Sequence, residues 1–385
     1  MRILLVVDQL DKKSSGGKVV EYLQEFFQKK EIQHFIIIPA KEKIDLNNSY
    51  RLKGNNKFPL QPLNEIYNYV NKKRLKKIIK TFRPSLAHFA SFDSAKPHYL
   101  IEILNRNRIP IIMQPWIYDF YCAQHYGYKN GIDCNSCLVN GFKSAITEKC
   151  LKPYRYYDIF KRYRLKNTLT SETIFLSSHE SMDKKLIKYG VADKNIKRCP
   201  VPFKPLKPIR GNEEAFYAVF GQNLEFKGFK AIINEFKKFP KRILKVFIIG
   251  DYDEDLTEFP NIQIFKDVTR ETGLFKELNK ATAIIIPSIW ETTGEYSLFE
   301  SLSLNKIVIL TDIGFHRSLK NLSNDIYTID INSLEQLDSI LNKIEEYKIR
   351  RNKGPTSRDV ILHQSEYFEK NLLKIYNDLV ISNTP

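Results

Sequence analysis

Short apolar runs recur along the first half of the chain, each with the length of one buried parallel strand. After the first run, Val19, Leu23 and Phe26 lie at helical spacing and predict a helix that ends near residue 29. A polar loop ending in Gly16 and Gly17 joins that run to this helix. Strand, glycine loop and helix together open a Rossmann-like unit. The runs lie at 3–7, 34–39, 109–113 and 173–177, and a further strand is expected over 83–89.

A second series of apolar runs follows a segment rich in proline. Pro200, Pro202, Pro205 and Pro208 mark this segment as a linker. We therefore predict an α/β protein of two Rossmann-like domains, 1–205 and 206–357, followed by a C-terminal helix within 358–385. The predicted strands of the second domain lie at 216–220, 244–250, 262–265, 283–286 and 307–310, and further helices are predicted over 333–348 and 356–380.

The stretch 287–305 has the pattern of an anion-binding turn. Pro287 and Ser288 end a buried strand, and a small-residue turn leads into a helix near Ser297. Free backbone N–H groups and the helix dipole then point at one spot. Glu300 is expected in the first turn of that helix. Taken alone it is equally well explained as a helix-dipole partner, stabilising the helix by a few tenths of a kcal/mol.

Length and composition fit a globular protein with two cores. The chain has 385 residues, of which 43% are hydrophobic. We find no apolar run of membrane-spanning length, and the N-terminus has the pattern of a strand rather than a signal peptide. Five cysteines without a signal peptide indicate a reducing compartment, so a cytoplasmic location is expected.

The net charge of +17 is concentrated in the first half. Residues 1–205 hold 37 Lys or Arg against 18 Asp or Glu, a net of +19, whereas the remainder has a net of −2. A basic helix over 71–80, with Leu75, Ile78 and Ile79, and the cation-aromatic segment 152–166 fit an anionic membrane surface. A solvated helix face is the plainer explanation of such a run. Nucleic acid is not expected as a partner, because no nucleic-acid-binding signature accompanies the charge.

Four of the five cysteines lie within 29 residues. Cys134 and Cys137 have the C-x2-C spacing of many zinc sites, flanked by Cys122 and Cys150. Thiols clustered in a reducing compartment favour a metal over a disulfide. A structural zinc ion and a set of buried, inert cysteines are the two explanations left open.

The stretch 287–305 resembles the donor-site signature of retaining glycosyltransferases of family 4, which have the two-domain GT-B fold. Pro287, Ser288, Trp290 and Glu300 fall on the family pattern. Thr292 occupies the place of the first glutamate of the family pair, so that carboxylate is missing. The resemblance covers the whole chain and is strongest over 216–320. It implies two domains that face each other across a cleft, with the last helix crossing back onto the first domain.

Family resemblance also implies which residues meet the substrates. In the second Rossmann loop, Lys227 and Gly228 match the phosphate-binding pattern, whereas Gln222 stands in the arginine position. In the first domain, Trp116 occupies the position of a histidine of many relatives, and Asp119 and His125 are the nearest residues able to replace it. The implied cleft residues are Gly16, Gly17, His88 and Trp116, with a buried structural role as the alternative for His88. The implied donor-binding residues are Gly221, Gln222, Lys227, Gly228, Thr292, Thr293, Gly294, Glu295, Tyr296, Ser297 and Glu300.

The resemblance implies transfer of a sugar from a nucleotide-diphosphate sugar with retention of configuration. The acceptor is expected to be a lipid-linked saccharide or a polysaccharide, as in surface-polysaccharide biosynthesis, with the protein peripheral on the cytoplasmic face of the membrane. Glu300, Lys227, Asp119 and His125 are the expected catalytic residues, and no cofactor is required. Relatives with the same cysteine-rich insert exist, which favours zinc. The alternative is a catalytically degenerate subunit that partners an active transferase; a GT-B epimerase or hydrolase fits the pattern of Trp290 and Glu300 less well.

Overall fold

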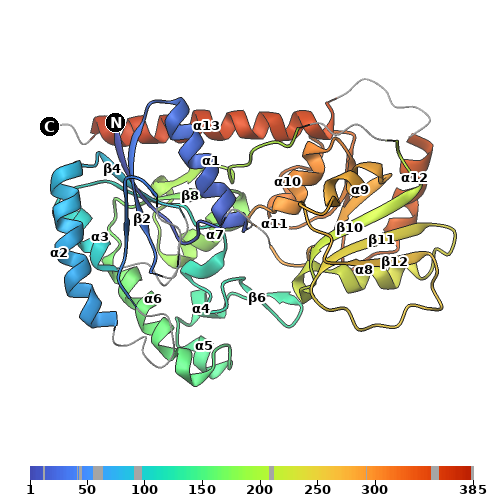
Figure 1. Ribbon diagram of the computed structural model, residues 1–385. Helices are drawn as coiled ribbons and strands as arrows, with labels where there is room; N and C mark the ends of the chain where they lie inside the picture. The colour runs from blue at the N-terminus through green and yellow to red at the C-terminus, as the bar shows by residue number, and fades with distance from the viewer. Residues whose placement is uncertain are drawn as a thin grey trace. The chain divides into compact units, whose positions relative to one another are not determined.

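Two parallel β-sheets, each covered by helices, make up the protein (Figure 1). The computed structural model describes every residue except 12–13, 41, 43–45, 55–63, 91–97, 208–211, 292, 348–354 and 383–385. The chain forms two compact units. Unit 1 comprises Met1–Lys129, Asp133–Phe203 and Tyr367–Pro385, and unit 2 comprises Asn130–Ile132 and Lys204–Glu366.

The sheet of unit 1 has seven parallel strands in the order β3-β2-β1-β4-β5-β8-β9. Parallel neighbours need crossover connections, and helices supply most of them. The strands are β1 (Arg2–Val6), β2 (Gln33–Ile38), β3 (Ser49–Arg51), β4 (Leu86–Phe89), β5 (Ile111–Met113), β8 (Ile174–Ser177) and β9 (Ile196–Arg198). The helices between them are α1 (Ser15–Lys29), α2 (Asn64–Phe82), α3 (His98–Arg106), α6 (Tyr156–Thr168) and α7 (Glu180–Tyr189).

Helices cover both faces of this sheet. The crossovers from β1 to β2 and from β3 to β4 run in opposite directions across it, so right-handed connections place α1 and α2 on opposite faces. The long helix α13 (Ser357–Ser382) lies beside α1, where Tyr22 and Phe368 meet edge to face at 5.7 Å. On the other face, α3 packs against both α2 and α6. Both faces of the central strands β1, β4, β5 and β8 are therefore buried, as the continuous apolar runs predict.

A cysteine-rich segment between β5 and α6 folds into short pieces. A two-stranded hairpin, β6 and β7, precedes two one-turn helices. The pieces are η2 (Tyr118–Phe120), β6 (Tyr128–Lys129), β7 (Ile132–Asp133), α4 (Ser136–Val139), α5 (Ser144–Thr147) and η3 (Pro153–Arg155), and a further 3-10 turn, η4 (Asp193–Asn195), precedes β9.

The sheet of unit 2 has six parallel strands in the order β12-β11-β10-β13-β14-β15. This is the strand order of a doubly wound Rossmann sheet, with its switch point between β10 and β13. The strands are β10 (Phe216–Gln222), β11 (Ile243–Ile249), β12 (Ile262–Lys266), β13 (Ala283–Ile286), β14 (Ile307–Thr311) and β15 (Ile326–Ile329). The helices are η5 (Glu225–Lys227), α8 (Phe229–Phe236), α9 (Leu274–Lys280), α10 (Tyr296–Ser303), α11 (Gly314–Arg317) and α12 (Gln336–Tyr347).

The hydrophobic pattern located most of these elements correctly. All ten predicted strands are present, nine of them within two residues at either end, and β4 begins three residues later than predicted. The helices predicted over 333–348 and 356–380 correspond to α12 and α13. Two predictions were wrong in position. Gly16 and Gly17 lie in the first turn of α1 rather than in the preceding loop, and Glu300 is the fifth residue of α10 rather than part of its first turn. In the described parts of the chain, no helix combines the length and apolar character needed to span a bilayer.

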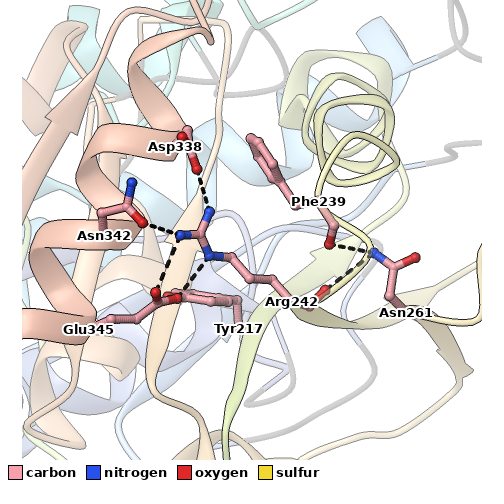
Figure 2. Close-up of polar contacts among 7 residues, drawn as sticks. All are labelled: Tyr217, Phe239, Arg242, Asn261, Asp338, Asn342 and Glu345. Carbon is pink, nitrogen blue, oxygen red and sulfur yellow. Dashed lines mark hydrogen bonds and ion pairs between the residues drawn. The ribbon is translucent and has the colours of Figure 1, made fainter.

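A polar network joins the amino-terminal edge of the unit 2 sheet to α12 (Figure 2). Arg242 donates to Asp338 at 2.5 Å, to Asn342 at 2.5 Å and to Glu345 at 2.8 Å. The Tyr217 hydroxyl donates to the same Glu345 carboxylate at 2.8 Å. One guanidinium thus fixes three side chains of one helix, which is the planar fork geometry that favours arginine over lysine.

We expect Arg242→Met to lower the free energy of unfolding by about 1–2 kcal/mol, because several charge-assisted hydrogen bonds are lost together. The exposed neighbour Lys241→Met removes the same charge and should change stability much less. Denaturant unfolding of both variants measures this. Equal stability of the two variants would contradict the role assigned to the network.

Candidate functional site

The candidate site lies at the carboxyl edge of the unit 2 sheet, at its switch point. The chain leaves β10 toward β11 on one side, whereas β13 and β14 lie on the other side. The loops that follow β10, β13 and β14 therefore meet at one edge. Open α/β sheets bind their ligands at such a point.

Close backbone contact locks the first two of these loops together. Gly228 has φ +70°, and a Cβ added there would lie 2.0 Å from the Pro287 carbonyl oxygen, so only glycine fits. The Ile289 amide donates to the Phe226 carbonyl at 2.9 Å, and the rings of Phe226 and Trp290 meet at 5.4 Å. This contact fixes where Lys227 lies.

Lys227 forms an ion pair with Glu295, the residue that directly precedes α10. The Glu295 side chain is 6% exposed, and Ser288 and Ser297 donate to its two oxygens at 2.7 and 3.0 Å. His316 Nε2, from α11, lies 3.4 Å from the same carboxylate. Side chains from all three loops therefore converge on one buried anion.

The environment of Glu295 keeps it ionised. Burial alone would raise the pKa of this carboxyl, but Lys227 and His316 outweigh burial and hold the pKa well below its ordinary value. The charge of Lys227 is therefore balanced within the protein. Sequence reasoning placed Glu295 among the donor-binding residues and did not identify it as the partner of Lys227.

Glu300 forms a second ion pair in the same region, with Arg270. The Glu300 side chain is 3% exposed, whereas that of Arg270 is 34% exposed. Arg270 follows β12, and its guanidinium also lies 5.8 Å from the centroid of the Phe275 ring. Neither Arg270 nor His316 was identified from the sequence. Each lies between predicted elements, Arg270 in the loop after β12 and His316 in the short helix α11, with no motif to mark it.

The other predicted donor residues lie on the same loops. Gly221 and Gly294 have positive φ, of 135° and 147°, which glycine adopts readily. Gln222 ends β10 and is exposed, whereas Thr293 is buried at 1% exposure. Tyr296 and Ser297 begin α10, and Thr292 lies outside the described residues.

Of the two glycines predicted in unit 1, Gly16 lies beside Trp116. A Cβ added to Gly16 would lie 3.1 Å from the Trp116 ring. One added to Gly17 would lie 1.9 Å from the Asp11 carbonyl oxygen, so the loop after β1 folds tightly over the start of α1. The structure thus brings Gly16 and Trp116 together near the carboxyl ends of β1 and β5.

His88 lies in a different environment. Its ring is fully buried on β4, and Nδ1 lies 2.6 Å from the Tyr376 hydroxyl of α13. Tyr376 is also fully buried, which raises the pKa of its hydroxyl well above the ordinary value. This placement favours the structural alternative for His88, a polar contact that fixes α13 on the sheet.

Asp119 and His125 approach the same guanidinium. Arg162 of α6 is 1% exposed, and its Nε donates to the Asp119 carbonyl at 3.1 Å. A second Arg162 nitrogen lies 3.5 Å from His125 Nδ1. The charge pattern grouped Arg162 with the cations of a surface segment, and that prediction was wrong. Arg162 instead holds the cysteine-rich segment against α6.

The four clustered cysteines are free thiols in one neighbourhood. Burial, with smaller contributions from the other three thiols, raises the pKa of Cys137 to about 11. Cys134 accepts a hydrogen bond at its carbonyl from Tyr121, and Cys150 packs beside Ala145. Among the described residues, no group of three or more His, Cys, Asp or Glu side chains is arranged to hold a metal ion. Zinc binding at Cys122, Cys134, Cys137 and Cys150 stays a prediction of the spacing.

Comparison with known proteins gives structural but not sequence relatives. No protein-family model and no curated protein sequence matches this chain. The structure resembles the lipopolysaccharide outer core galactosyltransferase WaaB, with 13% identity, full coverage of both chains and a TM-score of 0.61. It also resembles Anabaena HepE in complex with UDP, with 12% identity, 99% coverage of both chains and a TM-score of 0.60. Sucrose-phosphate synthase from Thermosynechococcus elongatus is similar over the full length of both chains, with 11% identity and a TM-score of 0.63.

The chain has the GT-B fold. The predicted fold class is thereby confirmed. At these identities the likeness establishes the GT-B fold alone, so the activity is argued from the site.

We expect Glu295→Gln to destabilise the protein by about 2–4 kcal/mol, because the variant leaves Lys227 without its buried partner. The Glu295 pKa is lowered on folding, so its stabilisation is present above the ordinary glutamate pKa and is lost as pH falls below it. Thermal unfolding at pH 7 and pH 4 should therefore show a smaller pH effect in the variant than in the wild type. An unchanged pH effect would contradict this assignment.

The cysteine spacing predicts about one zinc ion per purified chain. Metal analysis by mass spectrometry, with Cys199→Ser as the control for a distant buried cysteine, tests this directly. Chelation should then lower the melting temperature, as removal of a structural metal does. Absence of metal, together with unchanged stability after chelation, would leave the cysteines as packing residues.

Proposed function

We propose that this protein is a glycosyltransferase that uses a nucleotide-diphosphate sugar and retains the configuration of the transferred sugar. The observation that carries the proposal is the convergence of Lys227, Glu295 and Glu300 at the switch point of the unit 2 sheet. Two solved structures of HepE, which is similar in fold, contain UDP and UDP-glucose. No catalytic metal or other cofactor is required in this proposal.

Each residue of the site has a distinct role in this proposal. Glu300 accepts hydrogen bonds from the ribose hydroxyls, with Arg270 holding its carboxylate in place. Lys227 and the backbone N–H groups at the start of α10 face the diphosphate. Glu295 does not touch the donor in this proposal. It holds the Lys227 ammonium at the position where the phosphates arrive.

Charge stabilisation is the main contribution to catalysis in this proposal. Negative charge develops on the diphosphate as the bond to the sugar breaks. Lys227 and the α10 amides are fixed before the reaction and need not reorganise, which makes their stabilisation of the transition state large. Asp119 and His125 of unit 1 are proposed to position the acceptor hydroxyl for attack.

We propose that the acceptor is a lipid-linked saccharide of surface-polysaccharide synthesis, with a polysaccharide chain as the other acceptor class. A lipid-linked sugar stays at the headgroup plane, so the enzyme works as a peripheral protein on the cytoplasmic face of an anionic membrane. The net charge of +19 in residues 1–205 supports this location.

A catalytically degenerate binding subunit is the second candidate. Gln222 stands in the place of a phosphate-binding arginine, and Trp116 in the place of a histidine. Lys227 is in addition neutralised by Glu295. Release of sugar and nucleoside diphosphate from a panel of nucleotide sugars distinguishes the two, because a binding subunit is stabilised by its ligand but does not turn it over.

We expect Lys227→Ala and Glu300→Gln each to weaken donor binding or turnover by about 1–3 kcal/mol, through loss of charge-assisted hydrogen bonds. The measurements are the affinity for the nucleotide sugar, by calorimetry, and the rate at which nucleoside diphosphate is released. Lys227→Ala should lower the rate more than the affinity, because leaving-group charge is larger in the transition state.

Matched controls are available on the same unit. Lys230→Ala removes an exposed cation three residues from Lys227, and Glu258→Gln removes an exposed carboxylate. Both should leave affinity and rate unchanged. Donor affinity and turnover at the wild-type level in the Lys227 and Glu300 variants would overturn the proposal.

A further inference from the structure

The outer face of α6 carries a stripe of large aromatic side chains. Tyr156, Phe160 and Tyr163 recur at i, i+4 and i+7 and are 37%, 49% and 58% exposed. Arg162 and Leu165 are buried on the opposite face. The Phe160 side chain has no polar atom, so its exposed ring forms no hydrogen bond with water that would offset the cost of exposing it. We call these three residues the aromatic stripe.

Cations surround the aromatic stripe. The Arg164 guanidinium lies 5.4 Å from the Phe160 ring centroid, and Lys161 Nζ lies 4.9 Å from that of Tyr157. Tyr157 and Phe160 stack on each other with centroids 6.0 Å apart. Residues 152–168 contain six Lys or Arg and one acidic residue. Aromatic rings mixed with cations are typical of the headgroup level of a membrane.

The stretch 71–80 of α2 supplies mainly charge, whereas Tyr67, Tyr69 and Val70 in the amino-terminal part of the same helix are exposed. Leu75 and Ile79 are buried at 0% and 5% exposure, and Asn71, itself buried, bonds to the backbone of Lys53. The expectation that Leu75 and Ile79 would contact a membrane was therefore wrong, whereas Ile78 is half-buried. The exposed cations of its last three turns are Lys73, Arg74, Lys76, Lys77 and Lys80.

The two helices belong to the same layer of unit 1. The helix α3 packs against both α2 and α6, and Figure 1 shows all three along one side of the first sheet. The charges of α2 and the aromatic stripe of α6 are therefore available to one extended partner.

We propose that this layer docks on an anionic phospholipid bilayer, with the aromatic stripe entering the headgroup region and the α2 cations facing lipid phosphates. The inference rests on the proposed function, in which the acceptor is lipid-linked. Basic residues are attracted to anionic lipid surfaces, and amphipathic rings prefer the interface. Single-stranded nucleic acid fits less well, because Tyr157 and Arg164 already lie against the Phe160 ring on which a base would stack.

The test is sedimentation with vesicles of phosphatidylcholine alone and of equal parts phosphatidylcholine and phosphatidylglycerol. The wild type should bind only the anionic vesicles, and binding should weaken with salt. A variant with Phe160→Ser and Tyr163→Ser should bind about tenfold more weakly at constant charge. A variant with Lys73→Gln, Arg74→Gln, Lys76→Gln and Lys77→Gln should lose at least about tenfold with the aromatic stripe intact.

The opposite face of unit 1 provides the matched control. A variant with Tyr367→Ser, Lys370→Gln and Lys374→Gln removes an aromatic residue, 42% exposed, and two exposed cations from α13. It should bind anionic vesicles like the wild type.

In addition, tryptophan fluorescence of Phe160→Trp should shift to the blue on anionic vesicles and be quenched by brominated lipid, whereas Ile381→Trp should not respond.

Three outcomes would overturn the docking surface: no binding of the wild type at low salt, equal loss in the α13 control, or unchanged binding in the aromatic-stripe variant. A single-stranded oligonucleotide that binds through the same residues and displaces the vesicles would also do so. Thermal stabilisation by nucleotide sugars, measured on the same preparations, separates this result from the proposed function. If a nucleotide sugar stabilises the protein but the protein does not bind vesicles, the proposed function stands and the docking surface is refuted. If the protein binds vesicles but no nucleotide sugar, the docking surface stands and the proposed function is refuted.

Discussion

The buried ion pair between Lys227 and Glu295 is the interaction on which the candidate site depends. A buried carboxylate is costly unless cations and hydrogen bonds surround it. Here Ser288 and Ser297 donate to it, and Lys227 and His316 lie beside it. Because these groups come from the loops after β10, β13 and β14, the pair fixes three loops at once. Because Glu295 balances the charge of Lys227, the same pair also sets the net charge that a ligand meets at this site.

Other charged and polar side chains serve packing, although their residue types suggested chemistry. Arg162 is buried against the Asp119 carbonyl, and His88 is buried against Tyr376. Each occupies a position where an unpaired polar group would be costly, and each has a partner distant in sequence. At the other edge of unit 2, Arg242 joins the sheet to α12 in the same manner. Residue type alone therefore did not separate structural from functional groups in this chain.

Much of the fold was predictable because parallel sheets need continuous apolar strands. The runs that became β1, β10 and β13 are apolar on both faces, and their spacing leaves room for crossover helices. The helix α3 was missed because it is only nine residues long and six of them are buried, and periodicity does not separate so short an apolar segment from a buried strand. At the site, Lys227, Gly228 and Glu300 were found through motif spacing. Arg270 and His316 were not, since their role depends only on contacts across loops.

The sequence by itself determined the two α/β units, the loop with Lys227 and Gly228, the concentration of positive charge and the GT-B expectation. Each of these follows from local apolar pattern or from spacing within one motif. Only the tertiary structure decided that Glu295 neutralises Lys227, that Arg270 pairs with Glu300, and that Leu75 and Ile79 face the core while Phe160 faces outward. The physical reason is that helical spacing shows which side chains share a face, whereas the direction of that face depends on packing against elements distant in sequence.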